Sequence, residues 1–167
     1  MPKISIEMGN QEDLTELQMC AHEFIDFVDD FELNLRKEKY FILTAYYLKN
    51  LSGILLAEKQ ISKTDKLDTI IPKIRLIFIF VNPTYRRKFI AEKLLNSFIK
   101  IQRKRQVASV FIKLPRKYKK GKKYLKKHHF TQINTSKNEV TLERHLWYDF
   151  GLCLCDFIDD EIYNVLN

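Results

Sequence analysis

The residues best suited to chemistry lie in one segment, Val81 to Leu95. Its sequence, Val-Asn-Pro-Thr-Tyr-Arg-Arg-Lys-Phe-Ile-Ala-Glu-Lys-Leu-Leu, combines an apolar strand end, a basic turn and the start of an apolar helix. The first turn of a helix leaves backbone N–H groups without acceptors, and the helix dipole favours anions there. Three cations, Arg86, Arg87 and Lys88, stand directly before that helix. The segment therefore predicts a binding site for a pyrophosphate group.

This segment resembles the acetyl-CoA-binding signature of the GNAT superfamily of N-acetyltransferases, V-x-P-x-x-R-x-x-G-x-G/A. Val81, Pro83, Arg86 and Ala91 match the signature, whereas Phe89 stands at its first glycine. The resemblance covers about residues 3 to 147 and implies transfer of an acetyl group from acetyl-CoA to a primary amine. The acceptor would be a protein or peptide amine, a polyamine or a small-molecule amine.

The resemblance also implies which residues bind the coenzyme. The pyrophosphate would lie against the turn that contains Arg86, Arg87, Lys88, Phe89, Ile90 and Ala91. The pantetheine arm would lie between the strand that ends at Val81 and a strand at 107–114. There it would pair with the main chain of Phe80, Val81 and Asn82.

A second segment, Lys123 to Phe130, resembles the A-x-x-F-Y-x-x-x-G-F segment of the same family. Phe130 matches the final Phe, but His129 stands at the glycine and Leu125 at the tyrosine that protonates the leaving thiolate. Tyr124 is one place away, and one residue on a helix rotates a side chain by about 100°. That rotation points the Tyr124 side chain away from the direction of the family tyrosine, but Tyr124 is the nearest tyrosine and is the candidate general acid.

The general base is the least well specified part of the expected site. The family often has a Glu in the strand before the signature, but residues 73–81 contain no carboxylate. Glu58 in the preceding strand is the nearest replacement, with Glu7 behind it. Water is the alternative base if the bound amine has a pKa not far above neutral.

The elements that must position these residues follow from the hydrophobic pattern. Residues 73–81 are apolar after Arg75, which predicts a central strand covered on both faces. The fold class is α/β (α+β), with a mixed, mostly antiparallel central sheet of about seven strands flanked by helices. The expected strands are 3–8, 40–47, 53–61, 73–81, 107–114, 130–134 and 139–147, with a hairpin turn at 49–52. The expected helices begin near residue 12 and at 89 and 117, the last two ending at 105 and 128.

Length and composition favour one domain. The chain has 167 residues, enough for a single core but not for a second full domain. We expect a GNAT-like domain at 1–149 and a helical extension at 150–167, which could pack on its own sheet or on a second subunit as a homodimer. Three cysteines without a CxxC pair predict no disulfide framework and no metal site, in a reducing cytoplasm. The longest apolar run, Leu76 to Val81, predicts no membrane span.

Charge is concentrated in the middle of the chain. Residues 73–148 carry 21 Lys/Arg and 3 Asp/Glu, whereas the whole chain has a net charge of +8. Residues 115–129 alone have eight Lys/Arg, with Tyr118 and Tyr124 among them. This composition leaves a second function open, in which a catalytically degenerate GNAT-like module binds RNA or DNA through its basic face. A hybrid would acetylate an amine carried by a nucleic acid.

The acceptor of a transferase would bind near an acidic face of the first helix. Its carboxylates could attract a lysine side chain, a peptide amine or a polyamine. They are Glu23, Asp26, Asp29, Asp30 and Glu32.

Overall fold

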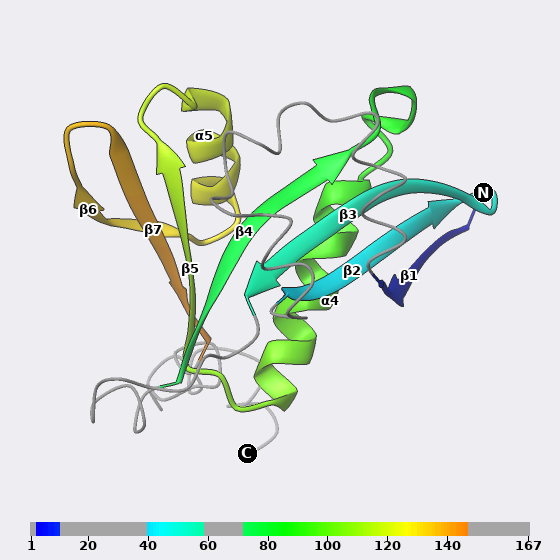
Figure 1. The fold of residues 1–167 in the computed structure, drawn as a ribbon, viewed down its shortest axis with the longest axis horizontal. Helices are drawn as coiled ribbons and strands as arrows, with labels where there is room; N and C mark the ends of the chain where they lie inside the picture. Colours follow the sequence, from blue (N-terminus) through cyan, green and yellow to red (C-terminus); the bar gives the residue numbers. More distant parts are fainter. Residues whose placement is uncertain (1–2, 11–39, 59–71, 147–167) are drawn as a thin grey trace, which may run out of the picture.

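The computed structural model describes residues 3–10, 40–58 and 72–146, which form one seven-stranded sheet with two helices (Figure 1). The sheet order is β1-β2-β3-β4-β5-β7-β6. The elements are β1 (Ile4–Met8), β2 (Tyr40–Tyr47), β3 (Asn50–Glu58), β4 (Lys73–Val81), η2 (Pro83–Tyr85), α4 (Ile90–Lys104), β5 (Ser109–Pro115), α5 (Lys119–Lys127), β6 (Thr131–Thr135) and β7 (Glu139–His145). The predicted fold class is confirmed. The first predicted helix, its acidic face and the extension at 150–167 lie outside the described residues.

The hairpin between β2 and β3 corrects one predicted boundary. The turn consists of Leu48 and Lys49, with φ of 49° and 68°, so β3 begins at Asn50 and not at residue 53. Two successive positive φ angles give a two-residue turn whose twist matches that of the strands, although glycine or asparagine usually occupies such a turn. Leu48-Lys49 carries no such signal, so the turn predicted at 49–52 is wrong in position, although the predicted hairpin is present.

A β-bulge at Ser52 follows this turn. Tyr46 pairs with Leu51 and Ala45 with Gly53, so Ser52 is the extra residue on β3. Its hydroxyl donates a hydrogen bond to the Ala45 carbonyl at 2.9 Å, and its own carbonyl accepts one from the Asn82 N–H at 2.8 Å. The bulge therefore ties the β2–β3 hairpin to the end of β4.

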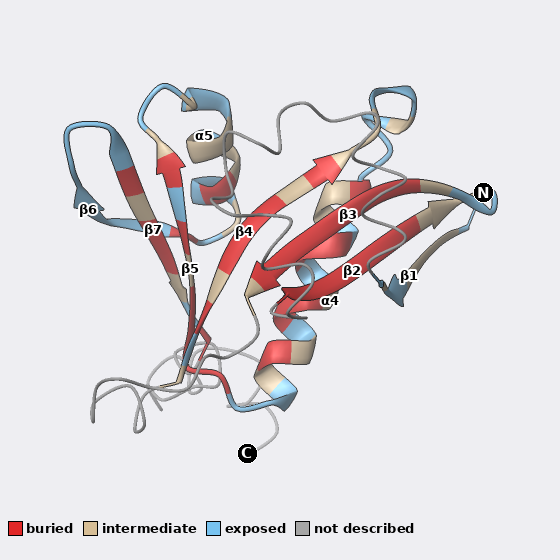
Figure 2. Ribbon diagram, in the orientation of Figure 1, coloured by how far each residue is buried: buried red, intermediate tan, exposed pale blue. Residues whose placement is uncertain are grey.

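The core covers both faces of β4, as predicted (Figure 2). On one face α4 packs its apolar side against the sheet, with Leu94, Leu95 and Phe98 fully buried. Their three- and four-residue spacing places them on one side of the helix. On the other face Ile54, Leu56, Phe78 and Phe80 form a second buried cluster.

The strands β4 and β5 are paired at their starts and separate further along. They pair in parallel only at their starts, Lys73 to Arg75 with Ser109 to Phe111. Beyond Arg75 the two strands diverge, while β5 continues antiparallel to β7 (Figure 1). The predicted splay is therefore present between β4 and β5. No helix among the described residues is long and apolar enough to cross a membrane.

The end of α5 explains why a glycine would suit position 129. Phe130 N–H donates to the Leu125 carbonyl at 3.0 Å and His129 N–H to the Lys126 carbonyl at 3.3 Å, the two bonds of a Schellman motif. His129 has φ of 68°, the left-handed conformation that this motif requires. Leu125 and Phe130 are both buried, so the helix end is anchored in the core.

We expect His129→Gly to stabilise the protein. Relief of the left-handed backbone gains about 1 kcal/mol or somewhat less, because glycine also loses more entropy on folding. That gain should raise the melting temperature by roughly 2 °C. His128→Gly is the matched control, since His128 has φ of −98° and should only lose stability. A lower melting temperature for both variants would contradict this account.

Candidate active site

The segment after β4 is held in place by a short hydrogen-bonded turn. The Asn82 side chain accepts a hydrogen bond from the Thr84 N–H at 3.1 Å, and its carbonyl accepts one from the Tyr85 N–H at 2.8 Å. Asn82 thereby caps η2, which turns the chain back toward the sheet. The predicted pantetheine-binding residues Phe80, Val81 and Asn82 are thus followed directly by a hydrogen-bonded turn.

The start of α4 presents backbone N–H groups in the arrangement that binds anions. The first intrahelical hydrogen bond runs from the Lys93 N–H to the Phe89 carbonyl at 3.1 Å. The N–H groups of Ile90, Ala91 and Glu92 therefore have no acceptor within the helix. Phe89 has φ of 60°, and a left-handed residue beside helical ones makes successive N–H groups converge in a concave nest. This position corresponds to the first glycine of the signature, and its left-handed conformation is one that glycine adopts without strain.

Gly53 brings this helix start close to the sheet. A Cβ on Gly53 would lie 3.0 Å from Ile90 Cγ2 and 3.0 Å from the Phe80 carbonyl oxygen. Because both neighbours already approach this closely, a larger residue would push the first turn of α4 away from β3. The position of the anion nest relative to the end of β4 thus depends on Gly53.

The three cations of the turn have different surroundings. Arg86 donates from Nε to the Val81 carbonyl at 3.1 Å, and its guanidinium lies 6.0 Å from the centre of the Phe80 ring. Lys88 Nζ lies 4.8 Å from the centre of the Tyr47 ring. Arg87 has no hydrogen bond, ion pair or ring contact to any part of the chain that the structure describes. Arg86 and Lys88 therefore also brace the turn, whereas Arg87 is available to a ligand.

The splay lies directly below this turn. From Leu76 to Val81 no residue of β4 pairs with β5. Within this stretch Leu56 pairs with Phe78 and Ala57 with Leu76, so Ile77 is the extra residue of a bulge. Bulges redirect side chains and backbone groups and are frequent beside active sites. This edge of β4 therefore has no partner strand in the described part of the chain, and an extended ligand can pair with its main chain along β4, starting at the anion nest.

Tyr124 lies on α5 and packs against the same core cluster as α4. Its hydroxyl is shielded from solvent and has no hydrogen-bond partner among the described residues. Burial, and secondarily the negative charge of Glu92, raises the pKa of Tyr124 to about 12. Its ring centre lies 4.5 Å from that of His128, whose pKa is lowered mainly by burial. Leu125, at the family tyrosine position, is buried in the core instead.

Glu58 lies at the other end of β4 from the turn. Its Oε1 is 3.3 Å from Nη1 of Arg75, where the pairing of β4 with β5 ends. Val81 lies six positions after Arg75 along the strand, which corresponds to roughly 20 Å. The structure therefore brings residues 80–91 together and Tyr124 near Glu92, and it places Glu58 at the base of the splay. Glu7, the reserve candidate, lies on β1 opposite Thr44, two strands beyond β3.

Two carboxylates were not predicted for this region from the sequence. Glu92 lies in the first turn of α4, and an acidic residue directly after the signature could have indicated it. Glu143 on β7 is 4% exposed, and its Oε1 lies 3.4 Å from Lys73 Nζ and 3.9 Å from His145 Nδ1. It pairs with Phe111, the residue opposite Arg75, so it stands level with Glu58 across the sheet. A single Glu in a strand gives no sequence sign that it is buried.

The described residues contain no group of three or more His, Cys, Asp or Glu side chains that could hold a metal ion. No protein-family model matches the sequence, and a search among curated proteins finds no match either.

Solved structures, in contrast, resemble this one closely. The PaiA N-acetyltransferase of Thermoplasma acidophilum, crystallised with coenzyme A, is 19% identical, with a TM-score of 0.65 over 86% of this chain and 99% of that one. The ribosomal-protein-S18-alanine N-acetyltransferase of Escherichia coli is 14% identical, with a TM-score of 0.66 over 86% and 94%. Arabidopsis thaliana NAA60, in complex with a bisubstrate analogue, is 16% identical, with a TM-score of 0.67 over 86% and 98%. At these identities the likeness shows a shared fold.

Proposed function

We propose that this chain, which has the GNAT fold, is an N-acetyltransferase that uses acetyl-CoA. The observation that carries the proposal is the anion nest at the start of α4, at the mouth of the gap between β4 and β5. A pyrophosphate on the nest and an extended arm along β4 would together bind the two ends of a long, anionic thioester. The neighbour from Thermoplasma acidophilum, crystallised with coenzyme A, supports this choice of ligand.

The reaction requires few side chains. A substrate amine attacks the acetyl carbonyl, loses a proton, and expels the thiolate of coenzyme A. Holding the two reactants in the correct orientation supplies a large part of the rate enhancement. Backbone N–H groups can stabilise the charge that develops on the carbonyl oxygen, which is why a backbone-lined site tolerates substitutions such as Phe89.

We assign the general base to Glu58, which lies at the base of the splay. Its ion pair with Arg75 must loosen for a carboxylate oxygen to accept the proton. We expect Glu58→Gln to lower kcat by at least about tenfold, since general-base catalysis typically contributes 10² to 10⁴. Glu143→Gln is the matched comparison at the same level of the sheet. Equal kcat for the Glu58 variant and the unchanged chain would remove Glu58 from the mechanism and leave water as the base.

The acceptor, the oligomeric state and the location of the protein are part of the proposal. We propose a primary amine as acceptor, either a protein or peptide amine, a polyamine or a small molecule. The acidic residues expected to attract it lie outside the described residues. A homodimer and a cytoplasmic location are proposed from the C-terminal sequence and the cysteine pattern alone.

The direct test is acetyl transfer by the purified chain. The protein is incubated with acetyl-CoA together with one acceptor at a time: a lysine-containing peptide, spermidine or a small primary amine. The masses of the products are measured by mass spectrometry. We expect enzyme-dependent acetylation of at least one acceptor and calorimetric binding of CoA. Absence of both CoA binding and acetylated product would overturn the proposal.

A second candidate function is favoured by α5. Its nine residues include six lysines and no acidic residue. None of these lysines forms an ion pair with the part of the chain that the structure describes. They are Lys119, Lys120, Lys122, Lys123, Lys126 and Lys127. Unpaired like charges repel one another, and a polyanion such as RNA would relieve that repulsion.

Salt dependence distinguishes this binding module from a transferase. About four phosphate contacts by α5 would make log affinity for single-stranded RNA fall with log salt at a slope near −3. If the protein is an RNA-binding module, we expect this slope together with micromolar affinity for RNA. Loss of all RNA retention at about 100 mM salt, together with measurable acetyl transfer, would exclude this second function.

A further inference from the structure

Phe89 is the residue of the site whose conformation and exposure most need an explanation. Its φ of 60° places a bulky side chain in the left-handed region, which costs roughly 1–2 kcal/mol. Phe89 is 73% exposed, so it does not pack in the core. A strained, exposed aromatic residue at a candidate site is a reason to look for a ligand contact.

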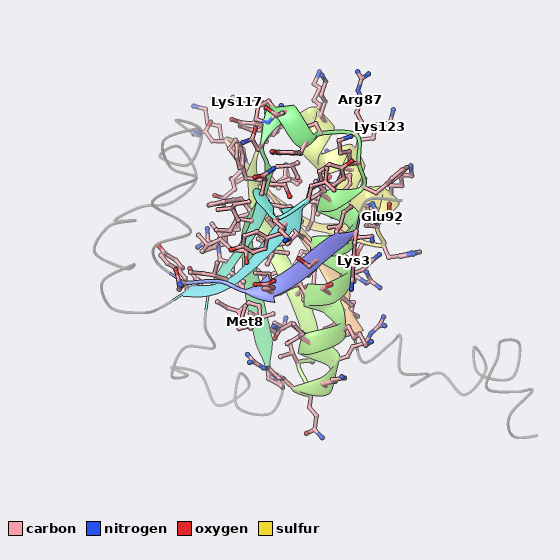
Figure 3. All side chains as sticks on the ribbon, turned by 90° about the vertical axis from the view of Figure 1, so that its right-hand side faces the viewer. Lys3, Met8, Arg87, Glu92, Lys117 and Lys123 are labelled. Carbon is pink, nitrogen blue, oxygen red and sulfur yellow. The ribbon has the colours of Figure 1, made fainter. Side chains whose placement is uncertain are left out.

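Arg87 is the natural partner of Phe89. It lies two residues earlier, also has a positive φ of 66°, and has no partner among the described residues. Figure 3 shows its side chain pointing away from the body of the molecule, at the end where Lys117 and Lys123 also lie. The other two cations of the turn are engaged with Val81 and Tyr47. One aromatic ring and one guanidinium are therefore both free beside the nest.

We propose that Phe89 and Arg87 bind the 3′-phosphoadenosine end of coenzyme A, with Phe89 stacked on the adenine and Arg87 paired with the 3′-phosphate. This inference rests on the proposed function, because it takes the pyrophosphate to lie on the N–H groups at the start of α4. The pantetheine arm would leave that point along β4, into the gap toward Arg75. The adenosine, attached to the other side of the pyrophosphate, would then lie outside the sheet, where Arg87 and Phe89 are exposed.

The physical roles of the two residues are separate. Stacking on an aromatic ring does not depend on phosphate, and it typically changes affinity by about five- to 100-fold per base. A guanidinium contact to phosphate is charge-assisted and depends on the 3′-phosphate alone. Three related ligands therefore separate the contacts: CoA, 3′-dephospho-CoA, which lacks only the 3′-phosphate, and 4′-phosphopantetheine, which lacks the 3′-phosphoadenosine and one phosphate of the pyrophosphate.

The experiment measures calorimetric affinities of the full chain for these ligands. We expect Phe89→Leu to weaken CoA and 3′-dephospho-CoA by about tenfold each and to leave 4′-phosphopantetheine unchanged. Phe89→Tyr should retain the affinity for CoA, because the stacking surface is kept. Arg87→Gln should weaken only CoA, by about tenfold. Ile133→Ala on β6 and Lys104→Gln at the far end of α4 change exposed residues away from the turn; they are the matched controls and should change none of the affinities.

Three results would overturn the inference. If Phe89→Leu and Arg87→Gln bind all three ligands as the unchanged chain does, the two residues do not contact the nucleotide, and the proposed function stands without them. If the unchanged chain binds none of the ligands, both proposals fail together. If the two variants lose affinity for an oligoadenylate but not for CoA, the ring and the guanidinium serve a nucleic acid instead.

Discussion

Replacing Ala91 by Asp should abolish tight binding of coenzyme A while the protein stays folded. Ala91 is the second residue of α4, and its N–H is one of the groups expected to face the pyrophosphate. A carboxylate there would repel the pyrophosphate and compete for the same donors. Charge-assisted hydrogen bonds are worth roughly 1.5–3 kcal/mol each, so loss of two would weaken CoA by about 100-fold or more.

The same substitution should not harm the helix. An acidic residue in the first turn interacts favourably with the helix dipole, by about 0.3–1 kcal/mol. Asn96→Asp, on the exposed side of the middle of α4, makes the same change in charge away from the nest and should leave CoA binding intact. The measurements are calorimetric affinity and melting temperature for both variants. A folded Ala91→Asp protein with unchanged affinity would show that the pyrophosphate does not bind at the start of α4.

Most of the fold could be predicted because its signals are local. The apolar run at 73–81 and the 3.6-residue period of the helix after it identify β4 and α4 to within one residue. The other described elements agree with the predictions to within two or three residues at each end. Burial on both faces of a strand and on one side of a helix leaves a direct trace in the sequence, since it dictates which positions are apolar.

The position of the hairpin turn at Leu48–Lys49 could not be predicted, because no local signal in the sequence marks it. Its positive φ angles are imposed by the pairing of β2 with β3, which buries Ala45 and Ile54, and not by residues that favour such angles. Tertiary packing overrides the weak local preference for a turn at residues with Asn or Ser.

The candidate site likewise has one part that local sequence predicts and one part that depends on long-range packing. Residues 80–91 are contiguous in the chain, so their spacing already predicts a strand end, a turn and a helix start. The positions of Glu58 and Glu143 at the base of the splay follow only from the sheet order, in which β3 lies beside β4 and β7 beside β5, and Tyr124 lies elsewhere, near Glu92. Which of these carboxylates is buried, and that Tyr124 approaches Glu92, depends on long-range packing that no short window of sequence contains.

The two positions at which this chain replaces a glycine of the resembled segments adopt a backbone conformation that suits glycine. Phe89 and His129 both stand where glycine is usual, and both adopt left-handed φ angles of 60° and 68°. Both residues therefore carry a backbone strain that glycine would avoid. At position 129 the Schellman motif accounts for this conformation, whereas at position 89 the anion nest does.

Tyr124→Phe should separate catalysis from stability. A pKa of about 12 makes the phenol a weaker acid than a thiol, so full proton transfer to the leaving thiolate would be unfavourable. The expected role is instead a hydrogen bond from the hydroxyl to the thiolate as it forms. Loss of that bond should lower kcat by roughly 10- to 100-fold with little change in KM.

The stability of the same variant should be unchanged or higher, because the buried hydroxyl has no partner among the described residues and its removal relieves a desolvation penalty. The pH dependence gives a further check. With its pKa raised from 10.0 to about 12, Tyr124 keeps its proton throughout the alkaline range in which most enzymes are assayed. The ratio of kcat between the unchanged chain and the variant should therefore stay constant from about pH 7 to pH 10, whereas an unshifted tyrosine would lose half of its proton by the upper end. Tyr118→Phe, at the start of the same helix, is the matched control. If kcat falls by less than about twofold in Tyr124→Phe, the tyrosine packs between α4 and α5 without contacting the thioester, and the thiolate must leave unaided.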